Sequence, residues 1–262
     1  MRPLLSTAGV LVERIKINAI SKEQRAGRCV WVKRRRRLSR PVMLAANGFF
    51  RLAGAPVEAL ADLRDWREWE VGCFLGLHGD RYVAAVEGPR TVWAEELPGV
   101  NLTHHLDTGS LTPRMLTAAA LELRRAHEWQ CESFSGAWSH GDPHVGNFVY
   151  EEAENRARII DFEVRHCSLS ADDRHADDLL VFIQDLAGRL PSEQWVSSAA
   201  TFLRAYERPE IVSRLLKLLV LPNGAAGLWW KVRTSFLPSR ELLRRLNALR
   251  THLLSASEAL GQ

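Results

Sequence analysis

The amino-acid sequence predicts an α+β fold of two lobes, a small β-rich N-lobe followed by a larger helical C-lobe. Short apolar strand patterns dominate the first hundred residues, and amphipathic helical patterns dominate the rest, which also contains one β-hairpin pattern within residues 139–163. The break Leu97-Pro98-Gly99 lies between the two parts. We therefore expect an N-lobe over residues 1–97 and a C-lobe over residues 98–262.

At 262 residues the chain is long enough to form two lobes around a cleft. Its hydrophobic content of 46% and charged content of 25% are typical of a globular protein. The apolar run after Met1 is too short for a signal peptide, and the most apolar later stretch, residues 215–230, is interrupted. Together with four widely scattered cysteines, these features predict a cytoplasmic protein without a membrane-spanning segment.

Four apolar segments predict the strands of the N-lobe: 10–20, 28–34, 82–86 and 91–94. The polar segment 21–27 predicts a turn, so that the first two strands form a hairpin. Residues 42–52 are compatible with a helix or with irregular structure. Apolar residues at helical spacing over residues 56–77 predict one helix that ends near Gly79.

Five amphipathic segments predict the helices of the C-lobe: 112–129, 176–190, 192–206, 209–221 and 240–260. The first of them begins with Thr112 and Pro113, a favourable N-cap followed by a proline at the first helical position. The β-hairpin tract lies between the first helix and the second, and it carries the residues of chemical interest.

This tract places a carboxylate and an amide five residues apart, at Asp142 and Asn147, and a second carboxylate, Asp161, at the end of the next hydrophobic strand. Phosphoryl transfer from a nucleotide needs such a set. One Asp orients and deprotonates the attacking hydroxyl, and an Asn and another Asp hold the magnesium ions that bridge the phosphates. The alternative is a plain β-hairpin whose Asp-Pro and Asp-Phe pairs are turn residues.

The tract resembles the catalytic and metal loops of the protein-kinase-like superfamily. His-Gly-Asp at 140–142 and Asp-Phe-Glu at 161–163, in place of His-Arg-Asp and Asp-Phe-Gly, look like its small-molecule and sugar kinase branches. Those branches include aminoglycoside and choline phosphotransferases and lipopolysaccharide core-sugar kinases. The resemblance implies a two-lobed protein-kinase-like fold, ATP and Mg2+ as cofactors, Asp142 as catalytic base, and Asn147 and Asp161 as metal ligands.

The resemblance extends to the N-lobe. Lys33 follows Val30-Trp31-Val32, which is similar to the family's Val-Ala-Ile-Lys strand, and this implies that Lys33 contacts the nucleotide phosphates. Glu70, followed by apolar residues at +4 and +7, resembles the helical Glu that positions this Lys, and Glu68 is the second candidate. The plain alternatives are a Lys that opens a basic run and a solvated helical carboxylate.

Residues 93–99 resemble the hinge between the lobes, which implies that Glu95 and Leu97 offer backbone hydrogen bonds to the adenine. The alternative is a simple turn. Two departures from the family pattern stand beside these matches. No Gly-rich loop is visible, since residues 21–28 contain only Gly27, and Trp31 occupies the place of a small residue beneath the adenine. These departures keep a nucleotide-binding pseudokinase open as an alternative.

Further along the chain, the resemblance implies that Asp177 or Asp178 braces the loop of Asp142 from below. Acids that stabilise a helix dipole are the plain alternative. His140 is expected to pack under the same loop in a structural role.

Basic residues cluster at residues 33–37 with Arg40, and more loosely over residues 231–250. Such clusters suit nucleic acid, anionic lipid or a phosphorylated sugar, and a solvated face is the plain alternative.

We expect an ATP-dependent phosphotransferase acting on a hydroxyl of a sugar or small molecule, with a lipopolysaccharide core sugar as the first candidate acceptor. The alternative is a small atypical Ser/Thr protein kinase associated with tRNA modification. We also expect peripheral contact with an anionic inner membrane face, and no DNA partner.

Overall fold

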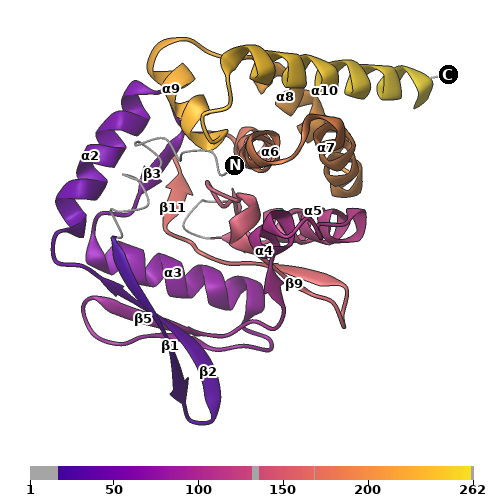
Figure 1. The fold of residues 1–262 in the computed structure, drawn as a ribbon. Helices are drawn as coiled ribbons and strands as arrows, with labels where there is room; N and C mark the ends of the chain where they lie inside the picture. The colour runs from indigo at the N-terminus through magenta and orange to yellow at the C-terminus, as the bar shows by residue number, and fades with distance from the viewer. Residues whose placement is uncertain (1–16, 132–135, 168, 261–262) are drawn as a thin grey trace.

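The computed structural model describes residues 17–131, 136–167 and 169–260. Figure 1 shows two lobes, with the N-lobe sheet below and the C-lobe helices above. The N-lobe sheet is antiparallel, in the strand order β1-β2-β5-β4. Its strands are β1 (Asn18–Arg25), β2 (Arg28–Arg35), β4 (Ala84–Val86) and β5 (Thr91–Glu95).

The hairpin of β1 and β2 corrects one expectation. The segment 21–27 was expected to be a turn, but only Ala26 and Gly27 form it, both with positive φ, of 47° and 80°. Such a two-residue turn matches the twist of paired strands. β1 tolerates polar residues because it is an edge strand of the sheet. The polar character of residues 21–25 therefore did not indicate a turn. Of the strand expected over residues 10–20, residues 10–16 lie outside the described ranges.

Two helices and a short strand connect β2 to β4: α2 (Ser39–Leu52), β3 (Val57–Ala59) and α3 (Leu63–His78). The single helix expected over residues 56–77 is therefore wrong in its first part. β3 pairs antiparallel with β11 (Val164–His166), a partner more than 100 residues away that helical periodicity cannot reveal. The N-cap of α3 is Asp62, whose carboxylate accepts hydrogen bonds from the backbone amides of Arg64 and Asp65.

After β5 the chain passes through Gly99 into β6 (Val100–Asn101) and α4 (Leu102–Asp107), two elements that the sequence analysis missed. Gly99 has φ +114°, and a Cβ there would lie 2.2 Å from the carbonyl oxygen of Tyr150, so glycine is required. β6 pairs with β9 (Phe148–Glu151), which pairs in turn with β10 (Arg156–Ile159). The division of the chain at residue 97 stays a prediction.

The C-lobe helices are α5 (Pro113–Glu128), α6 (Ala171–Arg189), α7 (Ser192–Tyr206), α8 (Pro209–Leu218), α9 (Gly224–Arg233) and α10 (Ser239–Leu260). Five of them match expected segments, although α6 begins five residues earlier than expected, after its N-cap Ser170. α9 was not expected, because its apolar stretch shows no clean helical period.

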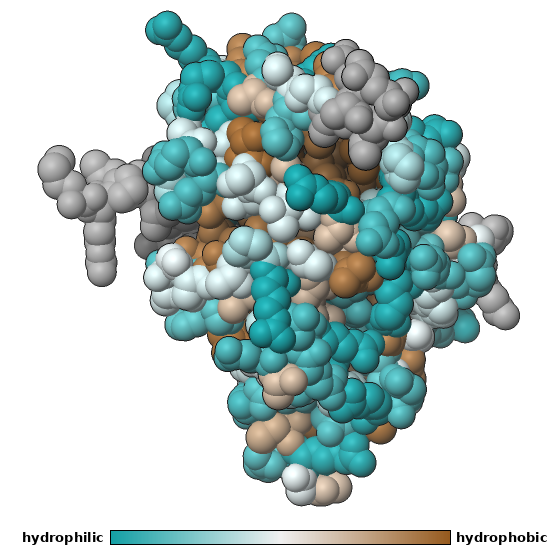
Figure 2. All heavy atoms as spheres, turned by 90° about the vertical axis from the view of Figure 1, so that its right-hand side faces the viewer, coloured by the Kyte–Doolittle hydropathy of each residue, from teal (hydrophilic) through white to brown (hydrophobic). Residues whose placement is uncertain are grey.

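Small strands and a short helical turn complete the described chain: β7 (Gln130–Cys131), β8 (Gly136–Ala137) and η2 (Val145–Asn147). Three fully buried tryptophans, Trp66, Trp138 and Trp195, are among the largest side chains of the core. On the face shown in Figure 2, hydrophilic side chains cover most of the surface, and hydrophobic ones are interspersed mainly in its upper half. Within the described ranges, none of the helices has both the length and the apolar character needed to cross a bilayer.

Candidate active site

A cavity of about 380 Å³ lies between the N-lobe sheet and the loops of the C-lobe. Six of the seven residues predicted from the sequence line it: Lys33, Glu70, Glu95, Leu97, Asn147 and Asp161. The seventh, Asp142, lies next to it, because the side-chain amide of Asn147 donates to the backbone carbonyl of Asp142 at 2.8 Å. The fold therefore brings together residues that are up to 128 positions apart in the chain.

Lys33 is the centre of the charge arrangement in this cavity. Its Nζ lies 2.5 Å from a carboxylate oxygen of Glu70 and also forms an ion pair with Asp161. Burial alone would lower the pKa of Lys33, but the nearby carboxylates of Asp161 and Glu70 raise it above its ordinary value. Glu68, the second candidate for this partner, is exposed and pairs with Arg64 at 2.7 Å instead.

Glu163 is a residue of this site to which the sequence analysis gave no role. Its carboxylate lies 3.8 Å from Lys33 Nζ and accepts a hydrogen bond from Asn18. Burial and the charge of Asp161 raise the pKa of Glu163 to about 7. The only signal for Glu163 in the sequence was that Glu replaces the Gly of an Asp-Phe-Gly motif. That replacement indicated a resemblance to one branch of the superfamily, but it did not indicate that the Glu163 side chain turns toward Lys33.

Three carboxylates gather here, since ligand oxygens of Glu70, Asp161 and Glu163 lie within 4.8 Å of one another. Burial raises the pKa of Glu70, whereas Lys33 outweighs the effect of burial on Asp161 and holds its pKa below the ordinary value. One oxygen of Glu70, Oε2, is buried and has no hydrogen-bond partner among the described residues. These oxygen donors and this excess of negative charge fit a hard divalent cation such as Mg2+.

The backbone of Asp161 contributes to this arrangement. Its φ of 71° lies in the left-handed region, which is uncommon for a residue other than glycine. The two carboxylates near Lys33, those of Asp161 and Glu163, flank Phe162, which is 1% exposed. Strain of this kind persists where the surrounding structure fixes it, and it is frequent at functional sites.

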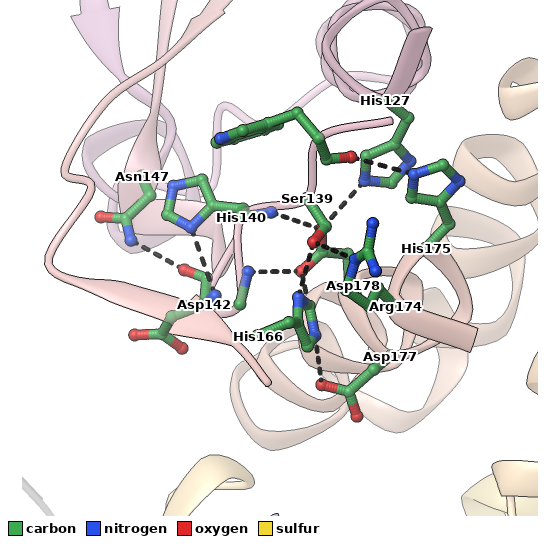
Figure 3. A network of polar contacts seen from close by, with 12 residues as sticks. His127, Ser139, His140, Asp142, Asn147, His166, Arg174, His175, Asp177 and Asp178 are labelled. Atoms are coloured by element: carbon green, nitrogen blue, oxygen red, sulfur yellow. Dashed lines mark hydrogen bonds and ion pairs between the residues drawn. The ribbon is translucent and has the colours of Figure 1, made fainter. Parts of the chain in front are cut away.

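The Asp142 loop, residues 139–147, is braced from below by Asp178 of α6. The Asp178 carboxylate accepts hydrogen bonds from the backbone amides of His140 at 2.7 Å and Gly141 at 2.8 Å, and from His127 Nε2 at 2.9 Å (Figure 3). Burial alone would raise the pKa of Asp178, but the surrounding histidines keep it well below its ordinary value. Of the two acids expected to brace the loop, Asp178 is the one that does so.

Asp177 has a different contact. It accepts a hydrogen bond from His166 Nε2 at 3.2 Å, and His166 Nδ1 lies 2.9 Å from the Ser139 hydroxyl at the start of the Asp142 loop. The carboxylate of Asp142 points away from these contacts in Figure 3. Its side chain is half-buried.

His140 connects the loop to the strand that precedes Asp161. Its Nε2 lies 3.1 Å from the carbonyl oxygen of Ile160, and its Nδ1 accepts from the amide of Asp142 at 3.2 Å. Burial lowers the pKa of His140, so the neutral ring is retained and its Nε2–H donates to Ile160. Gly141 has φ +88°, in the left-handed region that glycine adopts without strain.

The hinge offers one donor and one acceptor. The amide of Glu95 already donates to Val83 O at 2.8 Å, and the amide of Glu96 donates to Cys29 O at 2.9 Å. No described residue accepts a backbone hydrogen bond from Leu97. The carbonyl of Glu95 and the amide of Leu97 thus suit the paired donor and acceptor of an adenine edge.

Trp31 lies on the wall of the cavity, with 43% of its surface exposed. Its neighbours across the sheet are Lys22, whose Nζ lies 5.7 Å from the ring centroid, and Ala94. Val30 and Val32 are fully buried on the opposite face of β2, which confirms that Trp31 and Lys33 share a face. The indole of Trp31 forms one side of the cavity, whose volume is about 380 Å³ with this side chain in place.

The basic run differs from its expected form. Arg34 pairs with Glu23 at 2.8 Å, and Arg35 is only 4% exposed, with its guanidinium carbon 4.4 Å from the Trp66 ring centroid. The exposed cations that remain are Arg36, Arg37 and Arg40.

No protein-family model matches the sequence, and no curated protein matches it. Among solved structures, it is similar to an ethanolamine kinase from Plasmodium vivax, with a TM-score of 0.50 and 11% identity over 89% of this chain and 79% of that chain. APH(2")-IIa, solved in a ternary complex with streptomycin and ATP, gives a TM-score of 0.42 and 13% identity over 93% of this chain and 97% of that chain.

A protein from Mycobacterium tuberculosis, solved in complex with erythromycin, gives a TM-score of 0.39 and 20% identity over 73% of this chain. The present chain spans about half of that protein, 51% of its length. The likeness to the ethanolamine kinase assigns the protein-kinase-like fold that the sequence predicted. At this identity the likeness concerns the fold, and the activity has to be argued from the residues of the site.

Proposed function

We propose that the protein is an ATP-dependent phosphotransferase that transfers the γ-phosphoryl group to a hydroxyl of a sugar or another small molecule. The observation that carries this proposal is the ion-pair cluster of Lys33 with Glu70 and Asp161 inside the cavity between the lobes. A Lys paired with a helical Glu, beside an Asp that can bind Mg2+, is the arrangement that positions nucleotide phosphates in protein kinases.

In this proposal Lys33 contacts the phosphates, and Glu70 keeps the ammonium group in the cleft. Asn147 is oriented by its hydrogen bond to the Asp142 carbonyl, which leaves the amide oxygen of Asn147 available as a ligand. Asn147 and Asp161 would hold Mg2+, which supplies positive charge that neutralises the phosphate oxygens. Glu163 adds a third carboxylate beside Asp161.

Asp142 is the proposed catalytic base. Its carboxylate accepts the proton of the acceptor hydroxyl while the new O–P bond forms and the bond between the γ-phosphorus and the bridging oxygen of the β-phosphate breaks. The hydrogen bonds of Asp178 to the amides of His140 and Gly141 fix the backbone that carries Asp142. The loop is thus positioned before any ligand binds.

Phosphate transfer from γ-labelled ATP to core sugars, aminoglycosides, choline, ethanolamine and a protein mixture tests this proposal. Asp142→Asn should lower the rate by about 10²- to 10⁴-fold, the usual contribution of a general base, while nucleotide binding and the melting temperature stay unchanged. Asp80→Asn, at an exposed position, is the control. Transfer to protein alone would favour the protein kinase alternative, and nucleotide binding without any transfer would favour a pseudokinase.

Among acceptors we propose a lipopolysaccharide core sugar as the first candidate.

We also propose that the protein works in the cytoplasm at an anionic membrane face. Arg36, Arg37 and Arg40 are exposed beside Leu38, which is 77% exposed. Each such cation near an anionic surface contributes about 1 kcal/mol. Co-sedimentation with anionic vesicles should exceed that with neutral vesicles, should weaken in high salt, and should be lost when the three arginines become Gln. Equal recovery with both lipids would contradict this placement.

A further inference from the structure

A second cavity, of about 350 Å³, lies between α6, α8, α9 and the turn after α2. Its polar lining consists of Asp177, Gln184, Lys217 and Arg233, and the indoles of Trp229 and Trp230 form its apolar wall. The cavity borders the Asp142 loop, because Nη2 of Arg233 donates to the Gly141 carbonyl at 3.4 Å.

The packing of α9 fixes the position of this wall. A Cβ on Gly188 of α6 would lie 2.6 Å from the backbone of Thr234, and a Cβ on Gly227 would lie 2.5 Å from the carbonyl oxygen of Pro222. These glycines therefore allow a backbone approach that a larger residue would prevent. Trp229 is held in addition by edge and tilted contacts with two phenylalanines of α2, Phe49 and Phe50.

Two polar groups of the lining have unsatisfied hydrogen-bonding capacity. Gln184 is 2% exposed, and its Oε1 has no hydrogen-bond partner among the described residues. Arg233 stacks its guanidinium 4.6 Å from the Trp229 ring centroid, and its buried Nε also has no partner. No carboxylate in the described part of the chain forms an ion pair with Arg233. Buried polar groups without partners cost free energy, and a bound ligand can supply the missing contacts.

We infer that this cavity binds the acceptor and that the acceptor is an acidic sugar, a sugar that carries a carboxylate or a phosphate group. This inference rests on the proposed function. Arg233 and Lys217 provide the cationic contacts for the anionic group, and a planar guanidinium held on an indole is suited to a carboxylate or a phosphate. Gln184 and Asp177 provide hydrogen bonds for hydroxyl groups, and the indoles pack against the apolar face of the ring.

Direct titration calorimetry of the full chain tests the inference without catalysis. The probes are glucuronate, glucose 6-phosphate, glucose and inorganic phosphate. We expect one or both of the anionic sugars to bind at least about tenfold more tightly than glucose and than inorganic phosphate, a difference of about 1.4 kcal/mol. The carboxylate and phosphate arms show which anionic group the cavity prefers.

Arg233→Gln should remove this preference, and Lys217→Gln, at an exposed position, should weaken it. Arg250→Gln is the matched control, because Arg250 also donates to a backbone carbonyl at 3.4 Å, that of Leu219, and does not line the cavity. Melting temperatures of all variants show that the fold is kept.

Equal affinity for glucose and the anionic sugars, or a preference that survives Arg233→Gln in a folded variant, would overturn the inference. Inorganic phosphate that binds as tightly as glucose 6-phosphate would also overturn it, because the site would then recognise an anion without a sugar. If acidic sugars bind as expected but the protein transfers phosphate from ATP to no acceptor of the panel, the proposed function would be contradicted, and only the preference of the cavity for acidic sugars would stand. Efficient transfer to neutral or cationic acceptors, unaffected by Arg233→Gln, would overturn the inference alone.

Discussion

The cleft and the base of the Asp142 loop each contain a buried ionic cluster, and the two differ in balance. In the cleft, three carboxylates, those of Glu70, Asp161 and Glu163, face two cations, Lys33 and the buried Arg35, and Glu70 Oε2 has no hydrogen-bond partner among the described residues. Below the loop, the carboxylate of Asp178 accepts three hydrogen bonds, and its pKa is held low.

From this difference we infer that the cluster in the cleft is a binding site and that the cluster below the loop is a support. A buried carboxylate that accepts several hydrogen bonds, as Asp178 does, rigidifies the structure around it, whereas excess buried charge of one sign destabilises the ligand-free protein. The raised pKa of Glu163, about 7, reflects this excess in the cleft, where burial and the charge of Asp161 act in the same direction. Natural sites retain such costly groups where a ligand compensates for them.

Removal of the Asp178 carboxylate is expected to have the largest effect on stability, and it tests the supporting role of this cluster. Asp178→Ala leaves two backbone amides and His127 Nε2 without their acceptor. We expect a loss of about 3–5 kcal/mol in the free energy of unfolding, the range measured when one partner of a buried ionic contact is deleted. Urea denaturation measures it. Asp173→Ala, in the first turn of the same helix, is the control at a more exposed position, and an equal loss in both variants would contradict the bracing role.

The cleft should respond mainly in ligand affinity. Asp161→Asn removes a carboxylate whose pKa Lys33 holds below its ordinary value, so we expect a loss in the free energy of unfolding, smaller than that of Asp178→Ala because Glu70 and Glu163 remain beside Lys33. Affinity for ATP in the presence of Mg2+ should fall by about 2 kcal/mol or more, roughly thirtyfold, because a charged ligand contact is lost. Titration of ATP with and without Mg2+ measures this change. A variant whose ATP affinity keeps the wild-type Mg2+ dependence would show that Asp161 is not a metal ligand.

The contents of the cleft could largely be predicted from the sequence, because the motif residues are local signals. Asp142, Asn147 and Asp161 fall within one tract, and Lys33 directly follows an apolar strand. The structure places Asn147, Asp161 and Lys33 around one cavity, together with Glu70.

The support could not be predicted to the same detail. Two adjacent acids, Asp177 and Asp178, lie side by side in α6, and only tertiary packing decides which of them faces the loop. β3 was likewise missed because its partner β11 lies far along the chain. Glu163 was missed because backbone conformation, not sequence spacing, turns its side chain toward Lys33. Non-local pairing and side-chain direction are the properties that local patterns do not encode.

A finer comparison concerns pH, because the support contains buried histidines. His175 stacks on His127 with ring centroids 3.9 Å apart, and its Nε2 lies 2.9 Å from the Trp138 carbonyl. Burial, reinforced by the proximity of His127, lowers the pKa of His175 to about 3. The unfolded chain, with an ordinary pKa of about 6.5, therefore binds this proton more readily than the folded protein. Stability should be fully present above pH 6.5 and should fall as the pH drops toward 3.

His175→Gln removes this titrating group and keeps an N–H that can donate to the Trp138 carbonyl. Between pH 6 and pH 4, the variant should lose stability less steeply than the wild type, by up to about 1.4 kcal/mol for each pH unit, which is one proton fewer taken up on unfolding. The histidines His78, His127 and His140, whose pKa values burial also lowers, contribute to the remaining slope in both proteins. His252→Gln, on the exposed side of α10, is the control and should follow the wild type. Urea denaturation at a series of pH values gives the slopes, and parallel slopes for His175→Gln and the wild type would show that His175 does not contribute to acid sensitivity.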